Sequence, residues 1–446
     1  MKFPDGFEKR MKIQMESEWS SLKEALESEP PVSIRYNPLK FQKQQNEFSV
    51  PWCKDGFYLP QRPIFTLDPL LHAGAYYVQE ASSMLIEKAI NFISGDNEPK
   101  RVLDLCAAPG GKSTHLLSLL NSNSLLVSNE VIQTRVPVLI ENLTKWGYQN
   151  SIVTNLDPKI FARLEGFFDI ILVDAPCSGE GLFRKDPKAM NEWSEENASN
   201  CALRQTRILN DILPSLRPGG FIIYSTCTYN PSENQDQLQK MSNHHEMTSI
   251  QLDLVEKYGV LELSSNGIYG YQCIPNKTKG EGFFMGVMQK KSGEIKDHKI
   301  NKKLNISIPK TIDSSQWLSE SDNYVIFENH ENEFSFIKKS LQHDVEIILS
   351  HIPVKKIGTH FITLKGKNIL PTHGLALSVC KSPGLPTIEV PLQEALEYLR
   401  KNNLNIEYPG DGWKIVNYQG NALGWVNATS GRFNNKLPME FRIRTL

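Results

Sequence analysis

Two cysteines stand where a thiol could take part in a reaction. Cys177 lies in the segment DAPCSGEG, directly after the apolar run 168–173, and Cys227 lies in YSTCTYNPSEN, at the end of another apolar run. The carboxyl ends of parallel strands form the ligand crevice of an open α/β sheet, so we expect both thiols to face one pocket. A single cysteine is more often a small buried apolar residue. Two thiols that converge on one crevice favour a role in a reaction.

The cysteine pattern excludes other familiar sites. A phosphatase loop requires C-x-x-x-x-x-R, whereas Arg184 lies one residue too far from Cys177. The chain has seven cysteines, an odd number, widely spaced and never in a C-x-x-C pair: Cys53, Cys106, Cys177, Cys201, Cys227, Cys273 and Cys380. This spacing fits a reducing cytoplasm and fits neither a disulfide framework nor a zinc site. We therefore expect no bound metal.

A glycine-rich turn precedes the first cysteine motif. The segment DLCAAPGGKSTHLLSLL (104–120) has the pattern of a strand, a turn and a helix, which brings backbone N–H groups close to a ligand. A nucleotide P-loop would need glycine at position 106, where the chain has Cys106. The dinucleotide pattern G-x-G-x-x-G is also absent. Both phosphate-binding interpretations therefore fail.

Two acidic residues at the same sheet edge indicate a different cofactor. Glu130 ends the second expected strand, where a carboxylate accepts the ribose hydroxyls of a cofactor, and Asp157 follows the third. This geometry suits S-adenosylmethionine, whose sulfonium needs no phosphate cradle. Spacing alone leaves open that both acids only cap loops.

The elements that position these residues form an α/β pattern. Between about 96 and 290, short branched strands alternate with helical segments, which predicts a doubly wound, mostly parallel sheet buried on both faces. The expected strands are 101–107, 124–130, 151–155, 168–175 and 220–227. Residues 1–95 read as an amphipathic helix followed by short β-like runs. The tail reads as a strand, a helix and two further strands.

Length and charge set the remaining limits. A chain of 446 residues is too long for one core, and we expect four units: 1–95, 96–290, 291–370 and 371–446. Residues 290–303 hold six lysines and two acids with few apolar residues, which indicates a solvated linker. No secretory signal and no run of 18 apolar residues is present, so we expect a cytoplasmic protein that does not bind a membrane. The net charge of −1 gives no argument for nucleic-acid binding.

Three motifs together carry a family resemblance. DLCAAPGGKS, DAPCSGEG and STCTY resemble the Sun family of RNA 5-methylcytosine methyltransferases, and the flanking segments 74–85 and 280–290 are also similar to that family. RYNPLK is similar to its N-terminal RNA-binding region, and the tail from ALGWVN onward resembles a PUA-like RNA-binding domain. The resemblance implies a Rossmann-like class I methyltransferase core, between an N-terminal RNA-binding region and a small β-rich domain at the end. Residues 291–370 resemble nothing we can assign.

The resemblance also implies the roles of the site residues. Carbon 5 of cytosine is a poor nucleophile, so the thiolate of Cys227 would add to carbon 6 and Cys177 would assist its release. Asp174 would hold the base near nitrogen 3 by donating or sharing a proton. Lys112 would favour the thiolate or polarise the base, with a solvated loop lysine as the alternative. The expected S-adenosylmethionine site comprises Cys106, Ala107, Ala108, Pro109, Gly110, Gly111, Lys112, Glu130, Asp157 and Asp174.

The expected partner is RNA, bound by a monomeric enzyme. The target cytosine must be unpaired or flipped out, because carbon 5 is inaccessible inside a stacked helix. We expect 16S rRNA or the small ribosomal subunit as substrate. The alternatives are a tRNA cytosine-5 methyltransferase and an RNA-binding module whose catalytic site is inactive. The presence of both Cys177 and Cys227 at the expected motif positions argues against an inactive site.

Overall fold

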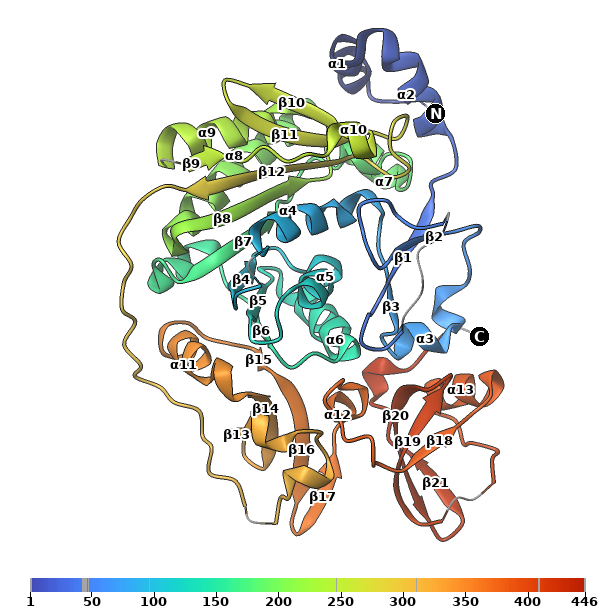
Figure 1. Cartoon of the computed structure of the whole chain (residues 1–446). Coiled ribbons are helices and arrows are strands. Elements are labelled where there is room, and N and C mark those ends of the chain that lie inside the picture. The colour runs from blue at the N-terminus through green and yellow to red at the C-terminus, as the bar shows by residue number, and fades with distance from the viewer. Residues whose placement is uncertain are drawn as a thin grey trace.

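A mostly parallel sheet forms the centre of the computed structural model (Figure 1), which describes residues 2–41, 46, 48–95, 97–245, 247–309, 311–407 and 410–444. Five parallel strands follow the order β6-β5-β4-β7-β8. They are β4 (Arg101–Asp104), β5 (Leu125–Asn129), β6 (Ser151–Thr154), β7 (Phe168–Asp174) and β8 (Leu216–Thr226). These are the five strands that the sequence predicts, so the doubly wound sheet is confirmed.

Antiparallel strands extend this sheet at both edges. Beyond β8 the order continues as β12-β11-β10, with β9 also paired to β12, and β15 pairs with β6 at the opposite edge. Their bounds are β9 (Met247–Ser249), β10 (Leu261–Ser265), β11 (Ile268–Cys273), β12 (Phe283–Lys290) and β15 (Lys356–Ile357). Most of the segment 280–290, which is similar to the family, thus forms β12, directly beside β8.

Helices cover both faces of the sheet. Ile171 and Val173 of β7 pack in one apolar cluster with residues of α8 and α9, whereas Ile170 and Leu172 pack in a second cluster with residues of α4, α5 and α6. The alternation follows from the period of two along a strand. The helices are α4 (Ile86–Ile93), α5 (Gly111–Leu119), α6 (Val136–Trp146), α7 (Pro187–Glu192), α8 (Glu195–Ile212), α9 (Gln235–His245) and α10 (Val255–Tyr258).

The N-terminal segment has the helix and short strands that the sequence predicts. Helices α1 and α2 lie beyond the β8 side of the central sheet, at the top in Figure 1, and a small sheet of order β2-β1-β3 follows. The elements are α1 (Asp5–Met15), α2 (Trp19–Glu27), β1 (Val32–Tyr36), β2 (Gly56–Leu59), α3 (Pro69–His72) and β3 (Tyr76–Val78).

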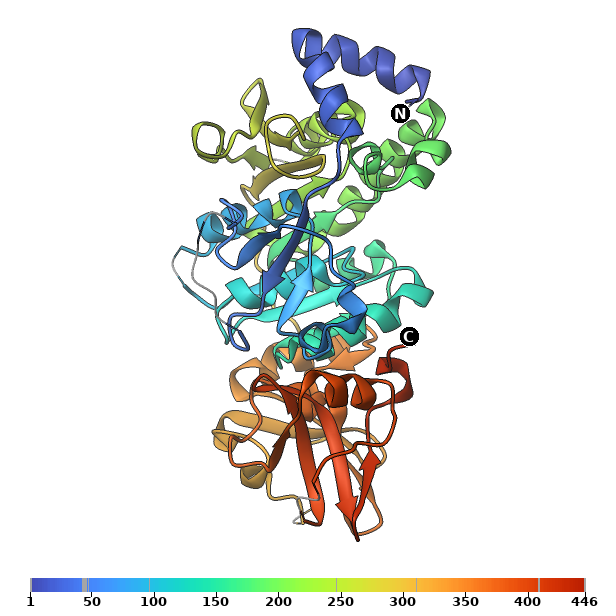
Figure 2. The ribbon, with the colours of Figure 1, turned by 90° about the vertical axis from the view of Figure 1, so that its right-hand side faces the viewer.

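The last third of the chain lies at the opposite end of the molecule from α1 and α2 (Figures 1 and 2). The lysine-rich segment 290–303 is exposed over most of its length; Lys290 ends β12, and residues 291–303 form neither helix nor strand, as expected of a solvated segment. Its place as a domain boundary stays a prediction. Two further sheets follow, in which most strand pairs are antiparallel. Their elements are β13 (Tyr324–His330), β14 (Glu333–Lys338), α11 (Gln342–His351), β16 (Thr359–Lys365), β17 (Asn368–Pro371), α12 (His373–Leu377), β18 (Thr387–Glu389), α13 (Leu392–Leu399), β19 (Gly412–Tyr418), β20 (Asn421–Thr429) and β21 (Arg432–Asn435).

These two sheets share an apolar core. Phe336 and Phe361 from the first sheet lie in the same buried cluster as Ile415 and Trp425 from the second. The predicted strand, helix and strand pair of the tail are present, and β21 is an additional strand. The division at about 370 stays a prediction, and a cut there would expose this shared core. Among the described residues, no helix has both the length and the apolar character needed to cross a bilayer.

Candidate active site

The glycine loop joins β4 to the N-terminus of α5. Gly110 precedes the first helical residue with φ of 113°, a backbone conformation that favours glycine over any residue with a side chain. The backbone around it is held from outside: the Ala107 N–H donates to the Asn129 oxygen at 2.8 Å, and Asn142 donates to the Pro109 oxygen at 2.8 Å. A fixed turn of this kind presents backbone N–H groups at a helix start.

Asp104 lies under this loop, at the end of β4. Its side chain is fully buried, and the Ser113 hydroxyl donates to its Oδ2 at 2.6 Å. The other carboxyl oxygen, Oδ1, has no hydrogen-bond partner in the described structure. Burial raises the pKa of Asp104 to about 7. A buried polar atom with no partner beside a cofactor-like loop is what a ligand group would satisfy. Asp104 is not among the site residues that the sequence predicts.

The two predicted cofactor acids have different surroundings. Glu130 is buried one residue beyond β5; it accepts the Ile132 N–H at 2.8 Å and pairs with Arg135 at 3.3 Å. Asp157 caps a short 3-10 helix through the Lys159 N–H at 3.2 Å. The loop-capping role therefore accounts for Asp157, and its contact with a cofactor stays a prediction.

Lys112 and Asp174 form an ion pair that links the glycine loop to the end of β7. The Lys112 Nζ lies 2.8 Å from Asp174 Oδ2, and Ser225 of β8 donates to Asp174 Oδ1 at 2.8 Å. Burial alone would lower the pKa of Lys112, but the neighbouring carboxylates, Asp174 first, raise it above its ordinary value. The ammonium therefore keeps its proton and is not a freely solvated loop lysine.

The two cysteines lie together at the same edge. Asp174 of β7 pairs in register with Ser225 of β8, so the loops that follow these strands run side by side. Cys177 and Cys227 are both half-buried, and their Sγ atoms lie 3.0 Å apart. Both thiols are free of any disulfide. The structure therefore brings together the pair that sequence topology placed in one crevice.

The surroundings of Cys177 favour its protonated form. The hydrogen bond of Cys177 with Cys227, together with burial, raises the pKa of Cys177 well above its ordinary value. The Cys227 N–H also donates to the Cys177 sulfur at 3.3 Å. Cys177 thus holds its proton, and a proton on Cys177 can donate to a sulfur anion at Cys227. Burial also raises the pKa of the third nearby thiol, Cys106, so this thiol stays protonated.

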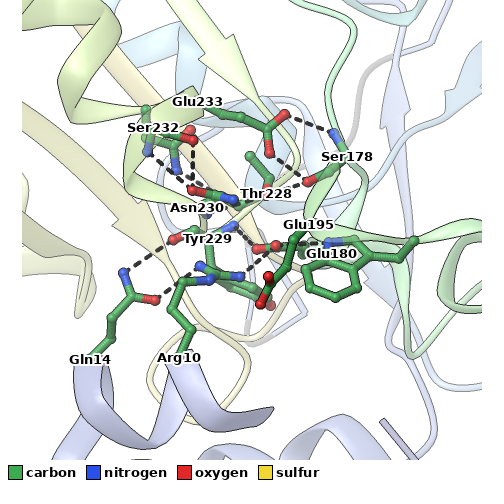
Figure 3. Close-up of polar contacts among 12 residues, drawn as sticks. Arg10, Gln14, Ser178, Glu180, Glu195, Thr228, Tyr229, Asn230, Ser232 and Glu233 are labelled. Atoms are coloured by element: carbon green, nitrogen blue, oxygen red, sulfur yellow. Dashed lines mark hydrogen bonds and ion pairs between the residues drawn. The ribbon is translucent and has the colours of Figure 1, made fainter. Parts of the chain in front are cut away.

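Buried carboxylates behind the two thiols were missed by sequence analysis. Glu233 accepts the Ser178 N–H at 2.8 Å and the Ser178 hydroxyl at 2.5 Å, and Glu180 accepts the Tyr229 N–H at 3.2 Å (Figure 3). Glu233 and Glu180 therefore both join the loop after β7, which carries Cys177, to the segment after β8, which carries Cys227. Glu180 stands inside the quoted motif DAPCSGEG, but nothing in its spacing indicates a buried partner.

A second cluster of potential ligand atoms lies away from these thiols. Cys53, Glu87 and His115 are buried with their polar atoms within 4.8 Å of one another, although the sequence predicts no metal site. The His115 Nε2 lies 3.1 Å from Glu87 Oε2. Burial and the Arg35 guanidinium lower the pKa of His115 to about 4, so the imidazole is neutral. A neutral imidazole beside a carboxylate fits a buried hydrogen bond between His115 of α5 and Glu87 of α4, and this bond joins the two helices.

Comparison with known proteins defines the class. A family model described as 16S rRNA methyltransferase RsmB/F matches residues 93–289, which contain the sheet, the glycine loop and both cysteines. Models of the N-terminal domain of 16S rRNA methyltransferase RsmF and of the methyltransferase RsmF PUA domain match residues 3–81 and 385–443. The protein is an RNA methyltransferase.

Full-length relatives define the family more closely. The chain is 30% identical to ribosomal RNA small subunit methyltransferase F of Vibrio vulnificus, over 92% of this chain and 90% of the relative. It is 27% identical to the protein of the same name from Salmonella paratyphi A, over 98% and 96%. The chain belongs to the ribosomal RNA small subunit methyltransferase F family.

Solved structures agree in fold. A methyltransferase homolog protein from Pyrococcus horikoshii is 30% identical, with a TM-score of 0.52 over 61% of this chain and 90% of that one. NSun6 from Pyrococcus horikoshii is 19% identical, with a TM-score of 0.54 over 65% and 99%, and supports the fold alone.

Proposed function

We propose that this protein transfers a methyl group from S-adenosylmethionine to carbon 5 of a cytosine in the RNA of the small ribosomal subunit. The single observation that carries the proposal is the 3.0 Å separation of the Cys177 and Cys227 sulfurs at the open edge of a methyltransferase sheet. The names of the full-length relatives support small-subunit rRNA over tRNA as the substrate. Family membership as a methyltransferase disfavours a silent RNA-binding module.

The residues of the glycine-loop edge fit the proposed cofactor. The backbone at Gly110 and Gly111, the partnerless Oδ1 of Asp104 and the buried carboxylate of Glu130 lie around one edge of the sheet. They would hold the amino-acid and ribose parts of S-adenosylmethionine, which supplies an electrophilic methyl group when bound. The loop lacks both phosphate-binding glycine patterns, in agreement with a cofactor that has no phosphate.

Cys227 is the nucleophile in this proposal. Its thiolate adds to carbon 6 of the cytosine, and the electron pair of the 5,6 double bond becomes available at carbon 5 for methyl transfer. The base gains electron density at nitrogen 3, where the Asp174–Lys112 pair can supply a hydrogen bond or a proton. The high pKa of Lys112 keeps that proton available at neutral pH.

Release reverses the addition. The proton at carbon 5 leaves to a base, the 5,6 double bond forms again, and the Cys227 sulfur departs with the electron pair of the carbon–sulfur bond. Cys177 keeps its proton and lies within hydrogen-bond distance of that departing sulfur. A donor aimed at a developing anion lowers the barrier for its departure. The two thiols therefore have separate tasks.

The proposal is tested by methyl transfer in vitro. The purified protein is incubated with S-adenosylmethionine carrying a labelled methyl group and with protein-free 16S rRNA, small ribosomal subunits or total tRNA. We expect label in the small-subunit samples, located at 5-methylcytosine by sequencing. Label found only in tRNA, or at another base atom, would contradict the proposed substrate or reaction.

A further inference from the structure

The N-terminal helix α1 contacts the loops that carry both cysteines. Figure 3 shows Arg10 and Gln14 rising from α1 toward the segments after β7 and β8. The Arg10 Nη2 donates to Glu180 Oε1 at 2.5 Å, and the Gln14 amide donates to the Tyr229 oxygen at 3.5 Å. Glu180 stands three residues after Cys177, and Tyr229 stands two residues after Cys227. One helix from the N-terminal region thus contacts both loops.

Glu180 is the link between α1 and the two loops. Its side chain is fully buried, and besides Arg10 it accepts the Trp193 indole N–H at 2.9 Å and the Tyr229 N–H at 3.2 Å. The neighbouring Gly181 N–H donates to the Cys227 oxygen at 2.8 Å. The loop after β7 is therefore bonded to the segment after β8 at the Cys227 oxygen and at the Tyr229 N–H, and the second of these bonds is made by the carboxylate that Arg10 contacts.

Apolar packing fixes the same helix in the same place. The ring of Phe7 contacts Phe183 with centroids 4.9 Å apart, and lies 6.2 Å from Trp193 and 6.4 Å from Tyr229. Phe7 is completely buried in this cluster. The packing holds α1 against the loops, so removal of the Arg10 charge alone need not detach the helix.

The charge of Arg10 has a distinct task within this packing. An ionised carboxylate with no exposed surface is costly unless a cation or several donors compensate it, and Arg10 is the cation in contact with Glu180. Without Arg10 the carboxylate keeps the Trp193 and Tyr229 N–H donors but loses its cation, so it is held less firmly and its bond to the Tyr229 N–H should weaken. Glu233, in the segment after β8, accepts the Ser178 N–H and the amide of Gln205 on α8, and neither of these contacts involves α1.

We propose that Arg10 is a positioning residue for methyl transfer, which acts through Glu180 on the relative placement of Cys177 and Cys227. The inference rests on the proposed function, because the spacing of the thiols matters only if both act on the base. It gives α1 a task in the reaction in addition to any contact with RNA. A shift of about 1 Å in a reacting group can lower a rate about 100-fold, so a loosened link should reduce turnover.

The test compares Arg10→Met, Arg10→Lys, Glu180→Gln and the Arg10→Met/Glu180→Gln double variant of the full-length protein. Lys12→Met is the matched control. This substitution also removes a positive charge from α1, but Lys12 pairs with Glu8 of the same helix and is exposed. The probe is 16S rRNA transcribed with 5-fluorocytidine, whose fluorine cannot leave carbon 5 as a proton does, so the covalent Cys227 adduct persists. The measured quantities are the single-turnover rate of adduct formation, kcat and KM with unmodified RNA, and cofactor affinity by calorimetry.

We expect Arg10→Met to lower kcat and the adduct rate about 10- to 100-fold while KM and cofactor affinity stay within about twofold. Arg10→Lys should recover most of the rate. The double variant should be no slower than the slower single variant, since both changes break one link. Lys12→Met should match the unmodified protein.

Two results would overturn the inference while leaving the proposed function intact. One is an unchanged kcat for Arg10→Met in a protein that forms the adduct normally. The other is a double variant whose loss equals the product of the two single losses. If Arg10→Met does not fold, Arg10→Lys and Glu180→Gln decide the question by the same comparison. Failure of the unmodified protein to form any adduct would instead contradict the proposed function.

Discussion

The sulfur atoms of Cys177 and Cys227 lie 3.0 Å apart, although 50 positions separate the two residues in the chain. Parallel pairing of β7 with β8 places the loops side by side, and Glu233 and Glu180 hold those loops from behind. The hydrogen bond to Cys227 and burial raise the pKa of Cys177, which favours the protonated form of that thiol. This setting fits the proposed division of tasks, in which Cys227 attacks the base and Cys177 assists release.

Glu130→Ala should weaken the binding of S-adenosylmethionine. The loss of a hydrogen bond between a ligand and a charged group costs about 1.5–3 kcal/mol, which corresponds to about a 10- to 150-fold increase in Kd. Calorimetry measures the affinity, and circular dichroism checks the fold. Glu141→Ala on α6, which removes an acid paired with Lys145, is the control. An unchanged Kd in a folded Glu130→Ala protein would remove Glu130 from the cofactor site.

Asp104→Asn should change the pH dependence of stability. Burial raises the pKa of Asp104 from 3.8 to about 7, so the folded state favours the protonated form. The stability that this group contributes is complete below about pH 4 and is lost as the pH rises through about 7. Asparagine cannot ionise, so its advantage over aspartate should grow between pH 5 and pH 8, by about 2–3 kcal/mol.

Differential scanning calorimetry at these two pH values measures the effect as a difference in Tm. Asp322→Asn, a change at an exposed aspartate, is the control and should give the same small difference at both values. If the difference between Asp104→Asn and the unmodified protein were independent of pH, the carboxyl group would be ionised throughout, contrary to its surroundings.

The basic residues of the tail should contribute to RNA binding. Alanine at all five positions should raise KM for RNA about 10-fold or more and leave cofactor affinity unchanged, because phosphate contacts add affinity without touching the reaction. The positions are Lys414, Arg432, Lys436, Arg442 and Arg444. Substitution is preferable to truncation near 370, since truncation would expose the core shared by Phe336 and Trp425.

The measurement is methylation of small-subunit RNA at several salt concentrations. Each lost phosphate contact should reduce the slope of log affinity against log salt by about 1. Lys240→Ala on α9 serves as a control for the loss of a surface charge. An unchanged KM and salt slope in the fivefold variant would mean that these charges belong to ordinary surface.

The central sheet and its thiol pair could be predicted because their signals are local. Strands buried on both faces read as apolar runs, and the rule that ligands bind at the carboxyl ends of parallel strands brought Cys177 and Cys227 together. The partners of these residues are long-range and have no such signal. Arg10 contacts Glu180, which lies 170 positions away in the chain. Asp104 is recognised as a candidate ligand only from its buried Oδ1, which has no hydrogen-bond partner in the described structure.

The most direct test of separate roles for the thiols compares Cys227→Ala, Cys177→Ala and the double variant. Each is incubated with S-adenosylmethionine and small-subunit RNA and then run on one denaturing gel. Cys227→Ala should bind cofactor but transfer no methyl group and form no protein–RNA bond. Cys177→Ala should transfer the methyl group and then retain a covalent adduct, because departure of the Cys227 sulfur lacks its donor. The double variant should behave as Cys227→Ala does.

An adduct formed by Cys227→Ala would reverse the assigned roles. Methylation by Cys177→Ala with no adduct, accompanied only by a modest loss of stability, would make Cys177 a packing residue of the loop after β7. Among the three variants, Cys177→Ala alone should give an adduct band; a band from either of the other two variants, or no band at all, would contradict separate roles for the two thiols.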